Sequence, residues 1–349
     1  MSQKWGTILV IGGAGRLGYF VIQELLKQPE CGRIVSINRK LHEENQHEVV
    51  EYRAVDVRAA ETLRTLMYDV KPEAIINTAA PGHVDGSTPV NEFHEVLVTA
   101  QASLIDLARL VGTKVFITTS SANVAGGWEH VSIDETAPYW PETSSFFPYW
   151  IKKAAAEREL LAADSPTLQT VSLRLPLIIG ERDYAFVPSL LKTLEQGQTG
   201  VQIGNNTGRL ATISAEDGAV AHVLALRRLL QPGNDVHGQI FYITNTRALP
   251  FWTMAQIVWT AAGWKKTREP FVVPEALAMC MALVSEWFVY LTSFGRRAAV
   301  FNQRVVYFMC REWTYDESKA ERTLGFVPKN DVEEQLKRSV EWELRKRKK

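Results

Sequence analysis

A tyrosine and a lysine four positions apart, Tyr149 and Lys153, carry the clearest chemical signal in the sequence. On a helix this spacing places both side chains on one face. A nearby ammonium ion favours the ionised form of a phenol, so Tyr149 could exchange a proton near neutral pH. Two serines, Ser120 and Ser121, end an expected strand upstream and could hold a substrate oxygen beside the phenol. Together these residues indicate acid–base chemistry on an alcohol or ketone, whereas the pair alone could be an exposed helix pair.

Closely spaced glycines provide a second signal, in the segment Gly12-Gly13-Ala14-Gly15-Arg16-Leu17-Gly18. The segment lies between a short apolar run and a helical stretch. This spacing allows a tight turn, close approach of the backbone to a pyrophosphate, and close packing of helix on sheet. The helix start would also offer free N–H groups to phosphates. We therefore expect a dinucleotide to contact Gly12, Gly15, Arg16, Leu17 and Gly18.

The choice between NAD and NADP depends on the end of the second expected strand. An acidic residue there would hydrogen-bond the ribose of NAD, but this sequence has Asn38-Arg39-Lys40. A neutral residue followed by two cations suits a 2′-phosphate, and the guanidinium of Arg16 could reach the same phosphate. Asn38 and Arg39 are thus expected cofactor ligands, with NADP favoured and NAD the alternative. Solvated surface charges remain the other interpretation of these residues.

The elements that would position these residues form a repeating strand–helix pattern. Apolar runs typical of buried parallel strands cover Thr7–Ile11, Ile34–Ile37, Ala74–Asn77, Lys114–Thr118, Gln169–Leu173 and Gln239–Ile243. Helical stretches cover Tyr19–Lys27, Ala59–Asp69, Phe93–Val111, Tyr149–Ala162 and Ala215–Leu230. The pattern predicts an α/β fold of the Rossmann type, a doubly wound parallel sheet with a smaller, mostly helical C-terminal substrate lobe. We assign residues 1–180 and 205–249 to the core, and residues 181–204 and 250–349 to the substrate lobe.

Composition narrows the function classes. The 39 lysines and arginines balance 39 aspartates and glutamates, so no net positive field would attract nucleic acid, and we expect none as a partner. The three cysteines are widely separated, which suggests a reduced, cytoplasmic setting. The seven histidines show no ligand spacing, so we expect no metal site.

Several motifs along most of the chain resemble the extended short-chain dehydrogenase/reductases, in particular the 3β-hydroxysteroid dehydrogenase and sterol-4α-carboxylate 3-dehydrogenase branch. Besides the glycine segment and the Tyr149–Lys153 pair, the matching pieces are Asp56-Val57, Asn77-Thr78-Ala79-Ala80-Pro81, Thr119-Ser120-Ser121-Ala122-Asn123-Val124, Leu173-Arg174-Leu175-Pro176, Gly238–Thr244, Pro250-Phe251-Trp252, Lys319-Ala320 and Leu324–Pro328. The stretch 238–252 points to the steroid branch.

The resemblance implies roles for single residues. Ser121 would orient the substrate, Tyr149 would be the general acid/base, and Lys153 would bind the nicotinamide ribose and lower the phenol's pKa. Further cofactor contacts would come from Asp56, Val57, Ala79 and Ala80. The sequence departs from the family pattern at four positions, which leaves substrate and cofactor preference open: Ile11, Arg16, Leu97 and Lys152.

The expected activity is NAD(P)-dependent interconversion of a secondary alcohol and a ketone. The resemblance implies the 3β-hydroxyl of a sterol or triterpenoid-like substrate, with loss of a neighbouring carboxylate. Two alternatives remain open: an NADPH-dependent ketoreductase of a terpenoid or polyketide tailoring pathway, and a non-catalytic NADP-binding regulatory protein.

An apolar stretch at 276–294 bears on localisation. It contains a single charged residue, Glu286, and approaches the length of a membrane-spanning helix. A membrane surface anchor at the endoplasmic reticulum, a helix lining an apolar pocket and a buried helix are the alternatives. The resemblance also implies a homodimer formed through the segments 93–111 and 149–162.

Overall fold

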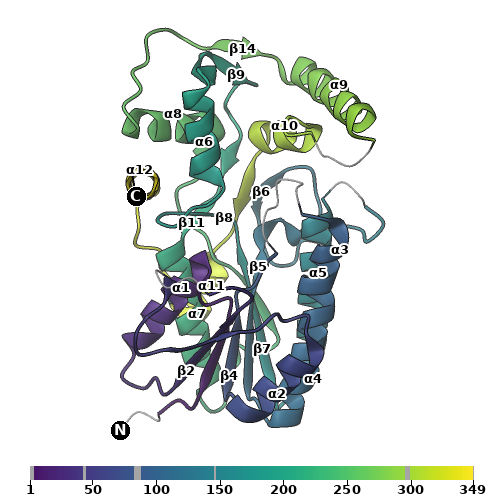
Figure 1. The fold of residues 1–349 in the computed structure, drawn as a ribbon, viewed down its shortest axis with the longest axis vertical. Helices are drawn as coiled ribbons and strands as arrows, with labels where there is room; N and C mark the ends of the chain where they lie inside the picture. Colours follow the sequence, from purple (N-terminus) through teal and green to yellow (C-terminus); the bar gives the residue numbers. More distant parts are fainter. Residues whose placement is uncertain (1–3, 42–44, 82–87, 145–146, 295–298, 349) are drawn as a thin grey trace.

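A seven-stranded parallel sheet forms the centre of the computed structural model, which describes residues 4–41, 45–81, 88–144, 147–294 and 299–348 (Figure 1). The strand order is β12-β7-β5-β4-β1-β2-β3. The chain moves outward from β1 to β3 and then returns to the other side of β1, so the order reverses between β1 and β4. The bounds are β1 (Ile8–Ile11), β2 (Ile34–Asn38), β3 (Glu51–Ala54), β4 (Ala74–Asn77), β5 (Val115–Ser121), β7 (Gln169–Leu175) and β12 (Gln239–Tyr242).

The sheet confirms the predicted Rossmann-type fold and adds the edge strand β3, which sequence analysis missed. β3 reads Glu-Tyr-Arg-Ala, is only partly buried, and pairs in the sheet with β2. An edge strand needs no continuous apolar run, so its pattern did not stand out. β5 also continues three residues beyond the expected Thr118, which brings Ser120 and Ser121 into the sheet.

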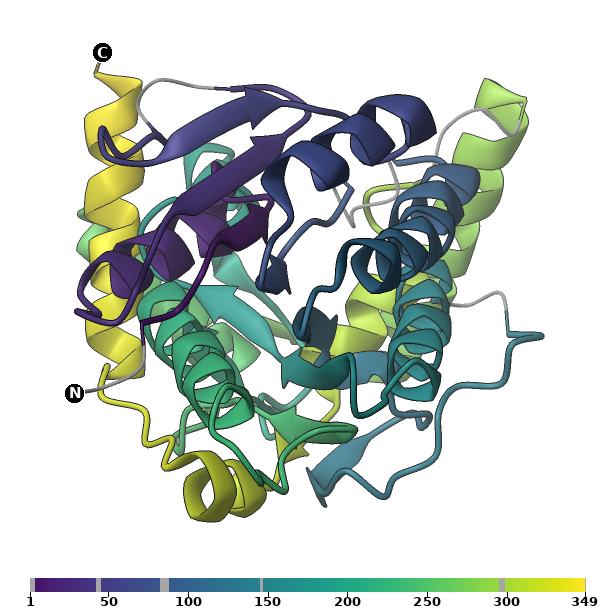
Figure 2. The same cartoon turned by 90° about the horizontal axis from the view of Figure 1, so that it is seen from below.

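Helices cover both faces of this sheet, as Figure 2 shows. On one face α1 (Arg16–Leu26) packs against α7 (Ala215–Leu229), and their apolar residues share a core with β1, β5 and β7. On the other face α2 (Ala60–Val70), α4 (Ala100–Val111) and α5 (Pro148–Ala162) enclose a second apolar layer. This arrangement fixes α1 and α5, the two elements that carry the expected chemistry.

The helix predicted at 93–111 is divided in the structure. It consists of α3 (Val90–Phe93), a π-helical segment at His94–Thr99, and α4. π-Helical turns are rare and often lie at functional sites. Leu97 lies in this segment and is buried facing the catalytic region.

A smaller lobe lies beyond the carboxyl ends of the strands (Figure 1). Its core combines α6 (Phe186–Glu195), α8 (Phe251–Ala261) and α12 (Val332–Arg347). A four-stranded sheet joins this lobe, formed by β13 (Leu249–Pro250), β10 (Arg209–Leu210), β15 (Trp313–Tyr315) and β6 (His130–Ile133). Its strands β6 and β10 come from segments that sequence analysis assigned to the core. The short helix α11 (Ser318–Leu324) packs with β12 and α7, so this part of the predicted lobe joins the Rossmann core.

The apolar stretch near the C-terminus forms α9 (Glu275–Ser293), which packs on α10 (Gln303–Cys310). Its buried residues are the small Ala278 and Ala282. Large side chains point outward, with Val284 67%, Phe288 66% and Leu291 64% exposed. By length and composition α9 could cross a membrane, and only 11% of its most apolar window is buried. A plain buried helix is therefore the wrong interpretation.

Candidate active site

The glycine segment forms the turn between β1 and α1. Gly12 has φ +84°, and a Cβ there would lie 2.9 Å from the Thr78 hydroxyl oxygen and 3.1 Å from the Ala79 nitrogen. A Cβ at Gly18 would collide with the carbonyl oxygen of Gly12. The first turn of α1 has no side-chain cap on its N–H groups. The glycines therefore leave a cradle that suits a dinucleotide pyrophosphate, at the reversal of strand order where such folds bind ligands.

The end of β2 is bonded to this turn. Asn38 accepts the Ala14 N–H through its side-chain oxygen at 2.8 Å. The next residue, Arg39, is exposed and pairs with Glu92 at 3.2 Å. The structure thus places Asn38 beside the glycine turn as expected, whereas Arg39 is already engaged with a carboxylate.

Arg16 does not point where sequence analysis expected. Its guanidinium bonds the carbonyl of Ile178 and the carboxylate of Asp183, the latter at 3.2 Å. Burial lowers the pKa of Arg16, and Asp183 opposes that shift. Because Asp183 is buried and distant in sequence, this competing partner could not be inferred from the glycine segment. Arg16 therefore connects the turn to the substrate lobe, and we do not retain it as a 2′-phosphate ligand.

The remaining cofactor candidates line the ends of β3 and β4. The Asp56 carboxylate accepts the backbone N–H of Arg58 at 3.0 Å and its guanidinium at 2.7 Å, which holds the pKa of Asp56 below its ordinary value. Val57 follows it and is partly exposed. Ala79 donates its N–H to the Asn77 side chain at 3.1 Å, and Ala80 is exposed. Of these positions Ala79 lines the small cavity beside Lys153, and Asp56 has the local capping role.

The catalytic candidates come from β5 and α5. Pro148 begins α5, so Tyr149 lies in its first turn and Lys153 one turn later. The Lys153 ammonium donates to the Thr119 carbonyl at 2.7 Å, at the end of β5. Ser121 ends that strand, and its hydroxyl accepts the Asn123 N–H at 3.4 Å. The structure thus brings the three predicted residues to one edge of the sheet.

The pKa shifts of Tyr149 and Lys153 differ from those expected from the sequence. Burial raises the pKa of Tyr149 to about 12, and the ring packs edge-on against Phe93. Burial lowers the pKa of Lys153 to about 8, and the carboxylate of Glu157 opposes that shift. The expected lowering of the phenol pKa by Lys153 is therefore not found. Its ammonium is directed instead to the Thr119 carbonyl.

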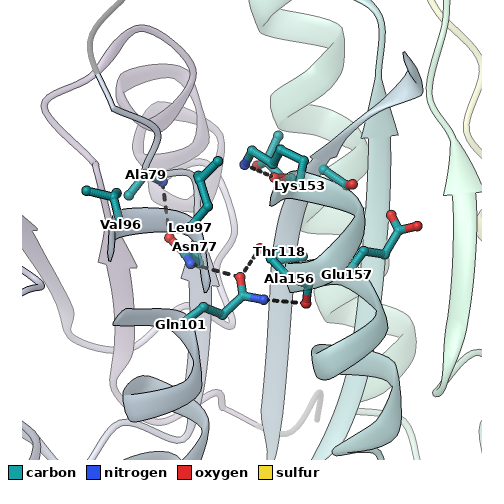
Figure 3. Close-up of a pocket in the computed structure, with 11 residues that line it drawn as sticks. Asn77, Ala79, Val96, Leu97, Gln101, Thr118, Lys153, Ala156 and Glu157 are labelled. Carbon is teal, nitrogen blue, oxygen red and sulfur yellow. Dashed lines mark hydrogen bonds between the residues drawn. The ribbon is translucent and has the colours of Figure 1, made fainter. Parts of the chain in front are cut away.

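A buried amide behind Lys153 was not anticipated. The Gln101 side chain donates to the Ala156 carbonyl on α5 at 2.7 Å and accepts from Thr118 at 2.9 Å (Figure 3). It also accepts the Asn77 amide at 3.3 Å. Gln101 lies one turn after Leu97, and both residues line a small cavity beside Lys153. A polar side chain therefore still faces this cavity, although position 97 is a leucine. Nothing in the spacing of the sequence distinguished Gln101 from other helix glutamines.

Two further buried networks hold the catalytic elements in place. Thr119 bonds His222 of α7 at 2.8 Å, and His222 bonds the Gly218 carbonyl at 2.7 Å. Glu157 and Arg174 form a fully buried ion pair at 2.7 Å. These contacts join α7, β5, α5 and β7, so the strand that accepts the Lys153 hydrogen bond is supported from both faces of the sheet.

Aromatic side chains cluster around the start of α5. The Phe147 and Trp150 rings lie 3.9 Å apart between centroids, and Trp128 meets Tyr307 of α10 at 4.9 Å. Trp128 remains 48% exposed. The start of α5 is therefore packed against a mostly buried aromatic cluster, of which Trp128 is exposed.

Comparison with known proteins identifies sequence relatives over most of the chain. Residues 9–273 match the model of the 3-beta hydroxysteroid dehydrogenase/isomerase family. The sterol-4-alpha-carboxylate 3-dehydrogenase (decarboxylating) of Schizosaccharomyces pombe is 31% identical, over 96% of this chain and 97% of that protein. The 2-alkyl-3-oxoalkanoate reductase of Stenotrophomonas maltophilia is 26% identical, over 95% of this chain and 97% of that one.

Solved structures show the same fold. The dTDP-glucose 4,6-dehydratase DesIV of Streptomyces venezuelae, with NAD bound, superposes with a TM-score of 0.75 at 19% identity and 98% coverage of both chains. The UDP-glucose 4-epimerase of Thermotoga maritima gives a TM-score of 0.74 at 21% identity, covering 98% of this chain and 100% of that one. The predicted fold and the oxidoreductase class are thus confirmed, and the chain belongs to the 3-beta hydroxysteroid dehydrogenase/isomerase family.

Proposed function

We propose that the protein oxidises the 3β-hydroxyl of a sterol or triterpenoid-like substrate to the ketone, with a nicotinamide dinucleotide as hydride acceptor. A carboxylate on the neighbouring carbon is then lost as carbon dioxide. The observation that carries the proposal is the placement of Tyr149 and Lys153 on α5 beside the end of β5, at the sheet edge where the glycine turn begins α1.

The chain's own residues account for the proton transfer. Ser121 would hold the substrate oxygen, and Tyr149 as phenolate would take the hydroxyl proton. The Lys153 ammonium, which donates to the Thr119 carbonyl, would hold the ribose of the cofactor. The nicotinamide, when bound, accepts the hydride that leaves the carbinol carbon. The bond to the carboxylate then breaks, its electron pair moves onto the new ketone as an enolate, and a proton completes the product.

The substrate class is supported by two independent features. Trp128, which is 48% exposed, packs on Phe147 at the start of α5 and on Tyr307 of α10, and an exposed aromatic ring there suits fused apolar rings. The Schizosaccharomyces pombe relative carries the name of a sterol-4-alpha-carboxylate dehydrogenase.

The direct test uses the purified full chain with a 3β-hydroxysterol 4α-carboxylate and, as control, the same sterol without the carboxylate. We expect reduced cofactor to form with both sterols, and carbon dioxide to be released only from the first. Absence of cofactor reduction with every 3β-hydroxysterol would contradict the proposal.

One observation favours the reverse reaction, reduction of a terpenoid or polyketide ketone by NADPH. With its pKa raised to about 12, Tyr149 is protonated at neutral pH, the form that donates a proton to a carbonyl oxygen. The Stenotrophomonas maltophilia relative is named as a reductase of oxoalkanoates. Rates measured in both directions at pH 7 distinguish the two functions.

We propose NADP rather than NAD as the preferred cofactor, because the described residues 38–41 at the end of β2 include no carboxylate for the adenosine ribose. Asn38 stands there, and Arg39 and Lys40 follow it. Titration of the protein with NADPH and NADH, followed by cofactor fluorescence, should show tighter binding of NADPH. Equal affinities would contradict this preference.

We also propose that α9 lies in the surface of a membrane, at the cytoplasmic side of the endoplasmic reticulum. Val284, Phe288 and Leu291 share one helix face and are each more than half exposed. The double substitution Val284→Asp and Leu291→Asp should abolish co-sedimentation with phospholipid vesicles. Val131→Asp, at an equally exposed apolar residue of β6, should leave it unchanged. Equal loss in both variants would contradict a specific role for α9.

A homodimer through the outer faces of α4 and α5 completes the proposal. Leu110 on α4 is 61% exposed and would be covered by such contact. Light scattering after size exclusion should give twice the chain mass for the wild type and a monomer for Leu110→Glu.

A further inference from the structure

We propose that His222 on α7 is a positioning residue for Lys153, acting across the sheet through Thr119 on β5. The histidine fixes the Thr119 side chain from one face, and the Thr119 carbonyl accepts the ammonium of a lysine whose helix, α5, covers the other face (Figure 2). The inference rests on the proposed role of Lys153 in the reaction.

The hydrogen bonds of His222 determine which ring nitrogen carries the proton. Nδ1 lies 2.7 Å from the Gly218 carbonyl oxygen, which can only accept, so Nδ1 is the protonated nitrogen. Burial lowers the pKa of His222 to about 4, so the ring is neutral at pH 7 and Nε2 is an acceptor. The Thr119 hydroxyl, 2.8 Å from Nε2, therefore donates to the ring. This bond holds the threonine side chain in one orientation.

Thr119 lies at a point where β5 has lost one of its neighbouring strands. The pairing of β4 with β5 ends at Asn77 and Thr118, whereas the pairing of β7 with β5 continues to Ser121. From Thr119 onward the sheet therefore holds β5 from the side of β7. The bond to His222 gives this part of the strand a second attachment, through a side chain rather than through the ladder.

The opposite side of the same residue serves the lysine. The Thr119 carbonyl accepts the Lys153 ammonium at 2.7 Å, beside the small cavity of Figure 3. The side chains that β4, α4 and β5 present to this cavity carry no charge. On α5, Glu157 opposes the lowering of the Lys153 pKa by burial, and Tyr149 is protonated at neutral pH. A hydrogen bond to a buried ammonium favours its charged form, so the place of the Thr119 carbonyl matters for the lysine.

The pairing of His222 with Thr119 is not needed to fill the core. Its neighbours on α7 in the same layer are apolar, among them Ala219, Val223 and Leu226. Two buried polar partners can be replaced together by apolar groups of the same shape at little cost in stability, whereas removal of one partner leaves the other unsatisfied. The polar pair therefore contributes direction at Thr119 more than stability, and the two contributions can be separated by mutation.

The test follows the Lys153 ammonium itself, by NMR titration of the full chain with ¹³C-labelled lysine. The Lys153 signal is assigned by its loss in Lys153→Arg. The double variant His222→Phe with Thr119→Val removes both polar partners, and urea unfolding should give nearly the wild-type stability. The Lys153 pKa should nevertheless fall by about one pH unit, as expected for a weakened charge-assisted hydrogen bond. His222→Gln, whose side-chain oxygen can still accept the Thr119 hydroxyl, should keep the wild-type value.

A matched control weakens the same helix without touching β5. The Ser214 hydroxyl caps the start of α7 by accepting the Asp217 N–H at 2.9 Å. Ser214→Ala should lower stability and leave the Lys153 pKa unchanged. In the double variant, by contrast, the fall of kcat/KM with rising pH should begin about one pH unit earlier, in step with the lysine.

Two results would overturn the inference. An unchanged Lys153 pKa in the double variant would mean that His222 only packs α7 on β5. An equal fall of that pKa in Ser214→Ala would mean that any weakening of α7 acts on the lysine. The NMR titration needs no substrate, so it decides the role of His222 even if no 3β-hydroxysterol is oxidised, a result that would contradict the proposed function separately.

Discussion

Replacement of Glu157 by glutamine should destabilise the folded protein by about 3–5 kcal/mol, the usual cost of breaking a buried ion pair from one side. Both members, Glu157 and Arg174, are 0% exposed, and their closest atoms are 2.7 Å apart. The carboxylate also accepts the hydroxyls of Tyr139 at 2.9 Å and Ser172 at 2.6 Å. A glutamine retains one acceptor oxygen but turns an NH₂ group toward these donors, and the Arg174 cation keeps no opposite charge.

The same change should lower the pKa of Lys153. Glu157 lies one turn after Lys153 and opposes the lowering of its pKa by burial. Without that carboxylate the pKa of Lys153 should fall below about 8. A loss of stability therefore accompanies an earlier loss of the Lys153 proton as pH rises.

Urea unfolding at pH 7, followed by circular dichroism, measures the free energy of unfolding. Glu333→Gln is the matched control, because Glu333 pairs with Lys337 on the exposed side of α12 at 2.8 Å. That variant should lose only about 0.3–0.5 kcal/mol, as exposed helix pairs do. If Glu157→Gln also lowers the free energy of unfolding by less than about 1 kcal/mol, the buried Arg174 cation is not left uncompensated by the mutation. That result would refute the expected cost of breaking this ion pair.

Three further changes test other parts of the site. Gly18→Ala should weaken cofactor binding by about tenfold or more, because the new Cβ collides with the Gly12 carbonyl oxygen and displaces the turn; unchanged cofactor fluorescence titration would argue against the cradle. Activity (kcat/KM) should fall as pH rises through about 8, where Lys153 loses its proton, and Lys153→Arg should remove that fall. Between about pH 8 and the ordinary pKa of 10.5, Lys153 is deprotonated in the folded chain and protonated in the unfolded chain. Its contribution to the free energy of unfolding should therefore increase as pH rises through this window. A contribution that decreases instead would contradict the burial of Lys153. Gln101→Leu should cost about 1–3 kcal/mol in thermal unfolding, because Thr118 and Asn77 lose their acceptor, and a smaller loss would show that water replaces it.

Residues whose roles depend on backbone geometry were predictable from the sequence. Gly12 and Gly18 occupy the positions where a side chain would meet the turn itself, so their spacing was sufficient evidence. Tyr149 and Lys153 share a helix face by period alone. The family resemblance named Ser121, and the structure places it at the end of β5.

Residues whose roles depend on distant partners were not predictable. Arg16 turns toward Asp183, which follows it by 167 positions. Gln101 and His222 make contacts that only the folded chain creates. The direction of the Tyr149 pKa shift also depends on burial, which the Tyr–Lys spacing does not reveal. The exposed face of α9 is a similar case, because the sequence of an apolar helix does not distinguish a buried helix from an exposed one.

The central claim is that Tyr149 transfers the proton during hydride transfer, and Tyr149→Phe tests it most directly. Hydride transfer is followed in a single turnover by cofactor absorbance, and cofactor affinity is measured on the same samples. The account predicts a loss of about a hundredfold to ten-thousandfold in rate with unchanged cofactor affinity. A variant that retains the wild-type rate while binding the cofactor normally would contradict it.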